Sequence, residues 1–292
     1  MAGAKDVKNR IKGIKDTKKI TNAMYLISST KLRRAKKSME DIEPYFYGLQ
    51  NLMQRMMRHF PETVHPYFKG NEDVPENEIT HGFLVVTADK GLAGSYNINV
   101  IKETEKLMGK NAACLYVVGE AGRRYFEHRK IPIEGNFTYT AQNPTRARAR
   151  VITNTFLKDY DEGKINDLTV VFTAMRNSLE AETRTMKLMP LEKEMAEDNI
   201  PPDVLREEFI IHPSPKEVLD AIIPPYVAGL VYSALVESYC CEQNSRMQAM
   251  SAANDSADEI IQELRVKYNR HRQAIITQEI TEVSAGARSG RI

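Results

Sequence analysis

From Tyr226 to about Ala285 the chain contains no proline and only one glycine, Gly229. A helix of that length would extend about 90 Å at 1.5 Å per residue, which is too long for the interior of an ordinary globular domain. In its last part, apolar residues recur at spacings of three and four, so the helix needs a partner helix. Pro224 and Pro225 precede it and suit the first turn of a helix, where a missing N–H costs little. We therefore expect the helix to begin there.

The N-terminal segment is the comparable partner. Between Lys5 and Lys37 there is no proline. Pro44 is expected to kink this segment or to start a new turn, and Pro61 and Pro66 mark its end. After Pro44, apolar residues follow the spacing of three and four that is typical of helices packed along one another: Phe46, Leu49, Met53, Met56 and Phe60.

The middle of the chain has a different pattern, with short apolar runs rich in β-branched residues that are typical of buried strands. The expected strands are Gly82–Ala88, Ala113–Val118 and Asp167–Thr173, with a last candidate at Arg184–Leu191. Helical patterns separate them, around Ile98–Met108, Ala121–Arg129 and Thr145–Tyr160. Alternating strands and helices favour βαβ units and a mainly parallel sheet. The polar stretch Glu192–Asp203 is expected to be an exposed connection.

The predicted fold class is α/β, with a Rossmann-like, mainly parallel sheet domain inserted between two long N- and C-terminal helices. Because the inserted domain brings the chain back, the two helices are expected to form an antiparallel coiled coil. The predicted boundaries are residues 1–60 for the N-terminal coiled-coil helix, 76–200 for the Rossmann-like α/β domain and 208–287 for the C-terminal coiled-coil helix.

Charge is distributed unevenly along the chain. Residues 1–37 carry twelve Lys or Arg against Asp6 and Asp16, a net charge of +10, so the remainder carries −8 of the total of +2. A basic arm of this kind predicts an acidic partner surface, which could be protein, nucleic acid or lipid. Tyr25 is the only aromatic residue in the arm, which leaves no platform for stacking bases.

The chain shows no apolar run near the ~20 residues that span a bilayer; the longest candidates are Gly82–Ala88 and Val227–Val236. The polar N-terminus has no apolar signal-peptide region. We expect a cytoplasmic protein without direct membrane insertion. Cys114 lies in an apolar run, and the adjacent Cys240 and Cys241 suit neither a metal site nor an easy disulfide within a helix, so no redox function is expected.

The loop Thr87–Asn97 directly follows the first expected strand, where nucleotide-binding α/β domains cradle phosphates. It has neither G-x-G-x-x-G nor G-x-x-x-x-G-K-[ST]. This favours a structural or partner-contact loop over a nucleotide site. The histidines form no metal-binding pattern, and no serine stands in a G-x-S-x-G motif. The sequence therefore predicts no catalytic residue, cofactor or metal, and a non-catalytic protein.

Two other functional classes remain as alternatives at this point. An α/β enzyme with a coiled-coil dimerisation stalk would bind a nucleotide or substrate as the isolated chain. A nucleic-acid-binding coiled coil would be retained on DNA or RNA in a salt-sensitive way. The missing nucleotide fingerprints disfavour the first alternative, and the heptad spacing with few aromatic residues disfavours the second.

Motifs at both ends and in the middle of the chain resemble one family, the gamma subunits of F-type ATP synthases. They cover nearly the whole chain in order. These motifs are Ile14–Met24, Lys31–Ala35, the loop Asp89–Gly94, Arg246–Met250, Ala253–Ala257, Tyr268–Arg270 and Arg272–Ile280. Ala93 stands where this family usually has cysteine.

The resemblance implies a central-stalk subunit whose coiled coil rotates inside a hexamer of alternating alpha and beta subunits. It would couple proton or sodium flow through the c-ring of Fo to ATP synthesis or hydrolysis at beta sites. The implied partners are the alpha and beta subunits, the epsilon subunit and the c-ring, with no nucleic acid. The implied location is peripheral, at the cytoplasmic face of the bacterial inner membrane.

The resemblance also implies which residues contact the beta subunit. Met24 and the basic cluster Lys31, Arg33 and Arg34 would face an acidic loop of beta. Lys90 and Ala93 would lie near the same loop. Arg272 and Gln273 would make polar contacts with another beta loop part-way along the cavity of the hexamer.

Overall fold

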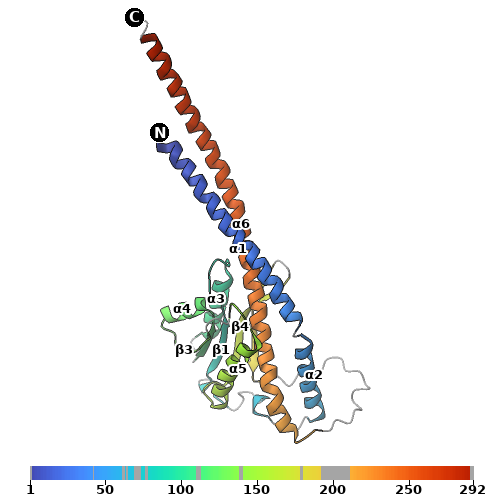
Figure 1. Ribbon diagram of the computed structural model, residues 1–292. Helices are drawn as coiled ribbons and strands as arrows, with labels where there is room; N and C mark the ends of the chain where they lie inside the picture. The colour runs from blue at the N-terminus through green and yellow to red at the C-terminus, as the bar shows by residue number, and fades with distance from the viewer. Residues whose placement is uncertain are drawn as a thin grey trace. The chain divides into compact units, whose positions relative to one another are not determined.

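The computed structural model describes residues 2–41, 43–60, 63, 65–68, 74–75, 78–109, 113–137, 141–177, 180–191 and 211–289. The chain divides into two compact units. One combines residues 1–30 with 246–292, and the other comprises residues 31–245. The elements (Figure 1) are α1 (Ala2–Glu40), α2 (Glu43–His59), the 3₁₀ helix η1 (Pro66–Phe68), β1 (His81–Val86), α3 (Tyr96–Met108), β2 (Ala113–Val118), α4 (Glu120–His128), β3 (Ile133–Phe137), α5 (Arg146–Asp161), β4 (Asp167–Met175), β5 (Ala181–Met189) and α6 (Pro215–Ser289).

The larger unit contains a five-stranded sheet in the order β3-β2-β1-β4-β5. β1, β2, β3 and β4 are parallel, and β5 pairs antiparallel with β4 at the edge. One face of the sheet packs against α3 and α4 through residues such as Phe83 and Val100. The other face packs against α5 and α6, for example through Leu84, Phe156 and Leu235. The result is a sheet with helices on both faces, as its apolar strands require.

The mixed α/β fold between long terminal helices agrees with the sequence expectation. β2 coincides with the expected strand, and β1, β4 and β5 differ from theirs by a few residues at the ends. β3 is a strand that the sequence analysis missed. It reads Ile133-Glu-Gly-Asn-Phe137 at the edge of the sheet, and because only one of its residues is fully buried it has no continuous apolar run. The expected connection Glu192–Asp203 lies outside the described residues.

The expected start of the long helix at Pro224 is wrong, because α6 begins at Pro215 and continues through both prolines. Its first turn is capped by Ser214. The Glu217 N–H donates to the Ser214 hydroxyl (3.3 Å), and that hydroxyl donates to the Glu217 carboxylate (2.9 Å). Proline at the first helical position follows the usual preference. Buried side chains around the interior prolines hold the helix in place despite the lost N–H groups: Leu219, Ile222, Ile223, Tyr226 and Val227.

By length and composition, α6 also contains a window apolar enough to cross a membrane, within Pro215–Ala285. In this part of the chain the sequence analysis recognised only the shorter apolar run Val227–Val236. Of the residues in the longer window, 56% are buried inside the molecule. The apolar character of this window therefore follows from packing against the sheet of the same chain.

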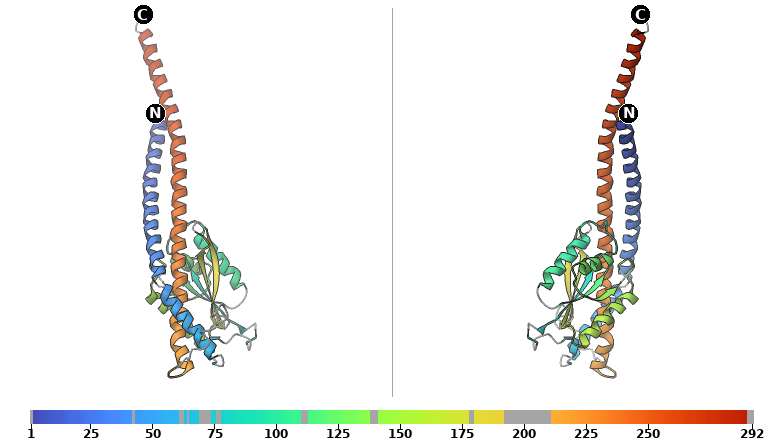
Figure 2. Two further views of the ribbon diagram at one scale, coloured as in Figure 1. Left: turned by 90° about the vertical axis from the view of Figure 1, so that its right-hand side faces the viewer. Right: turned by 90° about the vertical axis from the view of Figure 1, so that its left-hand side faces the viewer.

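In the smaller unit, α1 and α6 lie side by side (Figure 2). The Lys18 ammonium pairs with the Asp258 carboxylate, and the Thr21 hydroxyl donates to the Asn254 side chain. Near the start of α1, Gly3 lies next to the ring of His271. As the residue number increases along α1, the number of its contacting residue in α6 decreases. The two helices therefore run antiparallel here.

Pro44 marks a break between helices. α1 ends at Glu40 and α2 begins at Glu43, so proline occupies the second position of α2, where its missing N–H is tolerated. α2 ends at His59, just before Pro61. Met53 and Met56 of the expected apolar stripe are almost fully buried and join the same core cluster as α6.

Candidate functional site

The loop between β1 and α3 is fixed at the carboxyl ends of the parallel strands. The Thr87 hydroxyl donates to the Val118 carbonyl (2.9 Å) and accepts from the Gly122 N–H (3.0 Å), which joins the ends of β1 and β2. Gly119 has a φ of 96°, and a Cβ there would lie 2.2 Å from the Thr87 carbonyl oxygen. The close approach of the two strand ends therefore requires glycine.

Two polar side chains hold the outer part of this loop. The Asn97 side chain accepts from the Ala88 N–H (2.9 Å), and the Asp89 carboxylate accepts from the Glu120 N–H at the start of α4 (3.1 Å). Between these anchors the loop turns outward. Leu92 adopts a φ of 63° and is 64% exposed, so its side chain lies at the surface of the loop.

The crevice where related folds bind nucleotides is filled by the chain itself. In open α/β sheets the ligand lies outside the carboxyl ends of the strands where the strand order reverses, here between β1 and β4. At this place the Tyr96 hydroxyl and the Ser238 hydroxyl of α6 are hydrogen-bonded at 2.6 Å, and both residues are buried. Ala88, Ala93 and Cys241 pack around them. This packing favours a structural loop over a nucleotide site.

Burial raises the pKa values of three titratable groups behind this loop, Glu237, Cys240 and Cys241. Glu237 accepts a hydrogen bond from the Met175 N–H (3.2 Å), and burial raises the pKa of its carboxyl group. Burial also raises the pKa of the Cys240 thiol to about 11 and that of Cys241 to about 12. Both thiols are therefore protonated at neutral pH, and the thiolate is the reactive form.

The residues that the resemblance implies as beta contacts fall into both compact units. Lys31, Arg33 and Arg34 are exposed on α1, and Lys90 is exposed on the β1–α3 loop; these belong to the sheet-containing unit. Unlike these basic residues, Ala93 is not accessible at the surface. Its side chain is 2% exposed and packs against Tyr96 and Cys241. Met24, Arg272 and Gln273 belong to the smaller unit: Met24 is partly buried on α1, and the other two are exposed on α6.

The sequence analysis identified the loop Thr87–Asn97 but did not predict the contacts by which Thr87, Asn97 and Gly119 shape it. The available signal was the Gly119-x-x-Gly122 spacing, which directly follows the expected strand Ala113–Val118. The sequence analysis also missed Ser238, which no local pattern connects to Tyr96. Within the described ranges, no group of three or more His, Cys, Asp and Glu side chains is arranged to hold a metal ion.

Comparison with known proteins places these features in context. A family model described as ATP synthase matches residues 3–289. The ATP synthase gamma chain of Caldanaerobacter subterraneus subsp. tengcongensis is 42% identical over 297 residues, covering 98% of this chain and 99% of that protein. The ATP synthase gamma chain of Ruminiclostridium cellulolyticum is 38% identical over 287 residues, covering 97% of each.

Two solved structures share the fold at lower sequence identity. One is a chain in the rotor of the Euglena gracilis mitochondrial ATP synthase, with a TM-score of 0.65 and 12% identity, covering 94% of this chain and 99% of that chain. The other is a chain in the central stalk and c-ring structure of the Tetrahymena thermophila mitochondrial ATP synthase. It has a TM-score of 0.60 and 21% identity, and covers 80% of this chain and 99% of that chain.

Proposed function

The chain belongs to the ATP synthase gamma-chain family, and from this premise we propose that it is the central shaft that rotates inside a hexamer of alternating alpha and beta subunits. The observation that carries the proposal is the match to gamma chains along 98% of the sequence. Rotation of the shaft would couple ion flow through the c-ring to ATP synthesis or hydrolysis at sites in beta. The chain itself would be non-catalytic.

The shaft in this proposal is an antiparallel coiled coil of α1 and α6, inserted into the central cavity of the hexamer. The antiparallel pairs Lys18–Asp258 and Thr21–Asn254 support this arrangement. So does the exposed surface of α6 beyond Arg246, where large apolar side chains such as Val266, Ile280 and Val283 are more than half exposed. Exposed apolar positions of this kind mark contacts with other proteins when they cluster.

Contacts with beta are proposed to be few and polar. Lys31, Arg33 and Arg34 would face an acidic beta loop together with Lys90, while Arg272 and Gln273 would contact beta further along α6. Met24 is proposed to join the first group. Ala93 would act indirectly, because its burial helps to fix the loop that presents Lys90.

Weak contacts suit a shaft that meets three successive beta subunits. An exposed ion pair contributes about 0.2–1 kcal/mol, so each contact can break and re-form as the shaft turns. The shaft would shift the populations of beta conformations only insofar as its contacts differ between them. Contacts that bound one beta subunit tightly would stop rotation at that position.

The sheet-containing unit is proposed to rest on the c-ring and to bind the epsilon subunit. The protein would then be a peripheral component of the membrane complex, at the cytoplasmic face of the bacterial inner membrane. Nucleic acid has no part in this proposal. The filled crevice at the carboxyl ends of β1 and β4 supports a structural function for this unit, since Tyr96 and α6 occupy the place of a nucleotide.

The test is reconstitution of the full chain with purified alpha and beta subunits, followed by sizing and steady-state ATPase measurement. We expect one copy of the chain per hexamer and sustained ATPase. Arg272→Ala or Gln273→Ala is expected to lower this activity about two- to fivefold, the range that loss of an exposed polar contact would give.

Arg270→Ala is the matched control for Arg272→Ala, because this exposed arginine lies two residues earlier on nearly the opposite side of the helix. It should leave the ATPase close to that of the unmodified complex. The proposal fails if the chain stays monomeric in the mixture and leaves the activity of the hexamer unchanged. Equal losses for Arg270→Ala and Arg272→Ala would instead reject the assigned contacts while leaving the shaft in place.

A further inference from the structure

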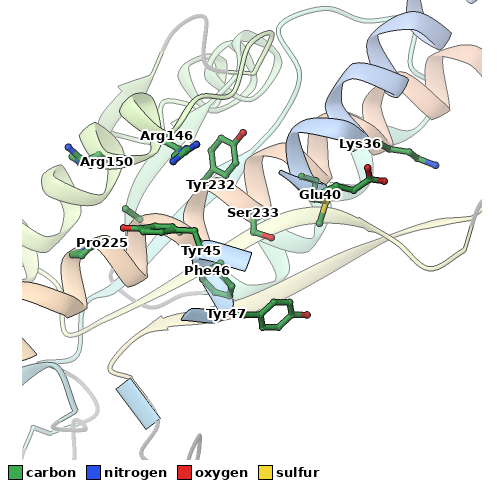
Figure 3. A pocket seen from close by; sticks show the side chains of 13 residues that line it. Lys36, Glu40, Tyr45, Phe46, Tyr47, Arg146, Arg150, Pro225, Tyr232 and Ser233 are labelled. Carbon is green, nitrogen blue, oxygen red and sulfur yellow. The ribbon is translucent and has the colours of Figure 1, made fainter. Parts of the chain in front are cut away.

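A cavity of about 450 Å³ lies within the sheet-containing unit, where the junction of α1 and α2 meets α5 and α6 (Figure 3). Its volume falls in the range of about 300–1,000 Å³ that is usual for small-molecule sites. The wall is mainly apolar and aromatic. It is formed by Met39, Phe46, Pro225, Ala228, Gly229 and Tyr232.

The wall is held in a defined shape by close packing. The Phe46 ring stacks on Tyr226, with centroids 5.5 Å apart and planes 11° from parallel. It also lies against Gly229, where an added Cβ would come within 2.7 Å of a ring carbon. Tyr232 is 7% exposed. The pocket is thus formed in the chain itself, so a ligand would not need to open it.

The rim of the pocket carries more positive than negative charge. Arg146 and Arg150 are one helical turn apart on α5 and lie on one side of the opening, with Lys36 and Glu40 of α1 on the other (Figure 3). Three cations and one carboxylate give a net charge of +2. In the described part of the chain, no hydrogen bond or ion pair engages the Arg146 or Arg150 guanidinium. By contrast, Arg148 of the same helix donates to the Asn143 carbonyl (2.7 Å).

We propose that this pocket binds a small amphipathic organic anion, with an apolar acyl or aryl body and a single carboxylate head group. The body would pack against Phe46, Pro225 and Tyr232. The head group would accept hydrogen bonds from the guanidinium groups of Arg146 and Arg150, whose planar donors match a carboxylate. The pocket shares no residue with the proposed beta contacts, so the inference goes beyond the shaft function.

Binding would connect elements that are far apart in the sequence. A ligand in the pocket touches the end of α1, the start of α2, and both α5 and α6. Because it binds the folded arrangement of these helices and not the unfolded chain, it stabilises that arrangement by mass action. The full chain is therefore expected to unfold at a higher temperature in the presence of the anion.

The experiment titrates decanoate, and separately naphthalene-2-carboxylate, into the full chain by isothermal calorimetry. Decanol and decylammonium are the neutral and cationic comparisons and should bind at least tenfold more weakly. Arg150→Gln is expected to weaken carboxylate binding by about tenfold, the effect of losing a charge-assisted hydrogen bond. Arg148→Gln removes the same charge from the same helix outside the pocket, and should keep the affinity within about twofold.

A second variant tests the pocket independently of charge. Ala228→Met would fill part of the cavity, so it should abolish binding of both acids while the far-UV circular dichroism spectrum of the chain stays the same. The proposal is overturned if Arg150→Gln and Arg148→Gln bind decanoate equally, or if decanol binds as well as decanoate. It is also overturned if neither acid binds below millimolar concentration while Ala228→Met prevents assembly with other subunits, since the pocket would then be a protein-docking surface.

Discussion

The single helix α6 passes through two different environments. Before Arg246 it belongs to the sheet-containing unit, and most of its apolar side chains there are buried, including Val231, Leu235 and Val236. From Arg246 to Ala285 only four residues fall into the buried class: Arg246, Met250, Ile261 and Leu264. The first region is helical because the sheet packs around it. The second depends on its own backbone hydrogen bonds and on contacts with α1.

The two regions of α6 therefore serve different purposes: the buried region stabilises the fold, and the exposed region is available for contacts with partners. Full burial of a large aliphatic side chain stabilises a fold by about 1.5–3 kcal/mol, so the buried region of α6 carries much of the stability of its unit. The exposed region can change at its surface with little loss of stability. It is therefore available for partner contacts that must stay weak, which fits the proposed position of Arg272 and Gln273.

The largest expected effect is loss of a buried side chain in the first region. Leu235 is 2% exposed and packs in the main core cluster, so Leu235→Ala should lower the free energy of unfolding by about 2–5 kcal/mol. Ile276→Ala, at a position of the second region that is 41% exposed, should change it by less than about 0.5 kcal/mol. Urea denaturation of the full chain measures both. Similar losses at the two positions would contradict the contrast between the regions.

A smaller effect is expected at Gly119, in the turn between β2 and α4. Gly119→Ala introduces a side chain at a φ of 96° and against the Thr87 carbonyl, so it should destabilise the chain by about 1–3 kcal/mol. Gly91→Ala is the matched control in the neighbouring loop, because an added Cβ there meets nothing within 4 Å. Urea denaturation of both variants checks this. A stable Gly119→Ala variant would show that the strand ends can move apart without cost.

The sequence predicted the elements whose pattern is continuous and local. β2 has an unbroken apolar run, and α3, α4 and α5 have clear helical spacing, so each was expected near its observed position. The expected helix start at Pro224 was wrong because it relied on the two consecutive prolines alone and did not consider Ser214 and Glu217 as helix-capping residues. The helix continues through them because tertiary packing around Ile223 and Tyr226 offsets the lost hydrogen bonds.

The candidate site was less predictable because its geometry depends on contacts distant in the sequence. The hydrogen bond between Tyr96 and Ser238 joins α3 to α6, and neither residue stands in a recognisable motif. The burial of Ala93 follows from the same packing, so the loop motif alone could not distinguish its inward position from the exposure of Leu92. The basic pocket at Arg146 and Arg150 likewise requires three separate segments to meet.

The smallest expected effect concerns the pairing of the two helices in the smaller unit. The side chains of Lys18 and Asp258 pair across them while remaining 35% and 61% exposed. A double-mutant cycle with Lys18→Ala and Asp258→Ala should give a coupling free energy of about 0.2–1 kcal/mol, and 1 M salt should reduce it by screening. Hydrogen exchange should show faster opening of α1 near Lys18 and unchanged protection in β1.

The pair Lys19–Asp16 is the comparison, since it lies within α1 and does not bridge the helices. Replacing Asp16 by alanine should leave exchange in the facing part of α6 unchanged, whereas Asp258→Ala should alter exchange in α1. If both substitutions speed exchange in α1 equally, the inter-helix pair adds nothing beyond local helix stability. The shaft would then hold together through its apolar positions, Ile261 and Leu264, and its charged surface would be free for the beta subunits alone.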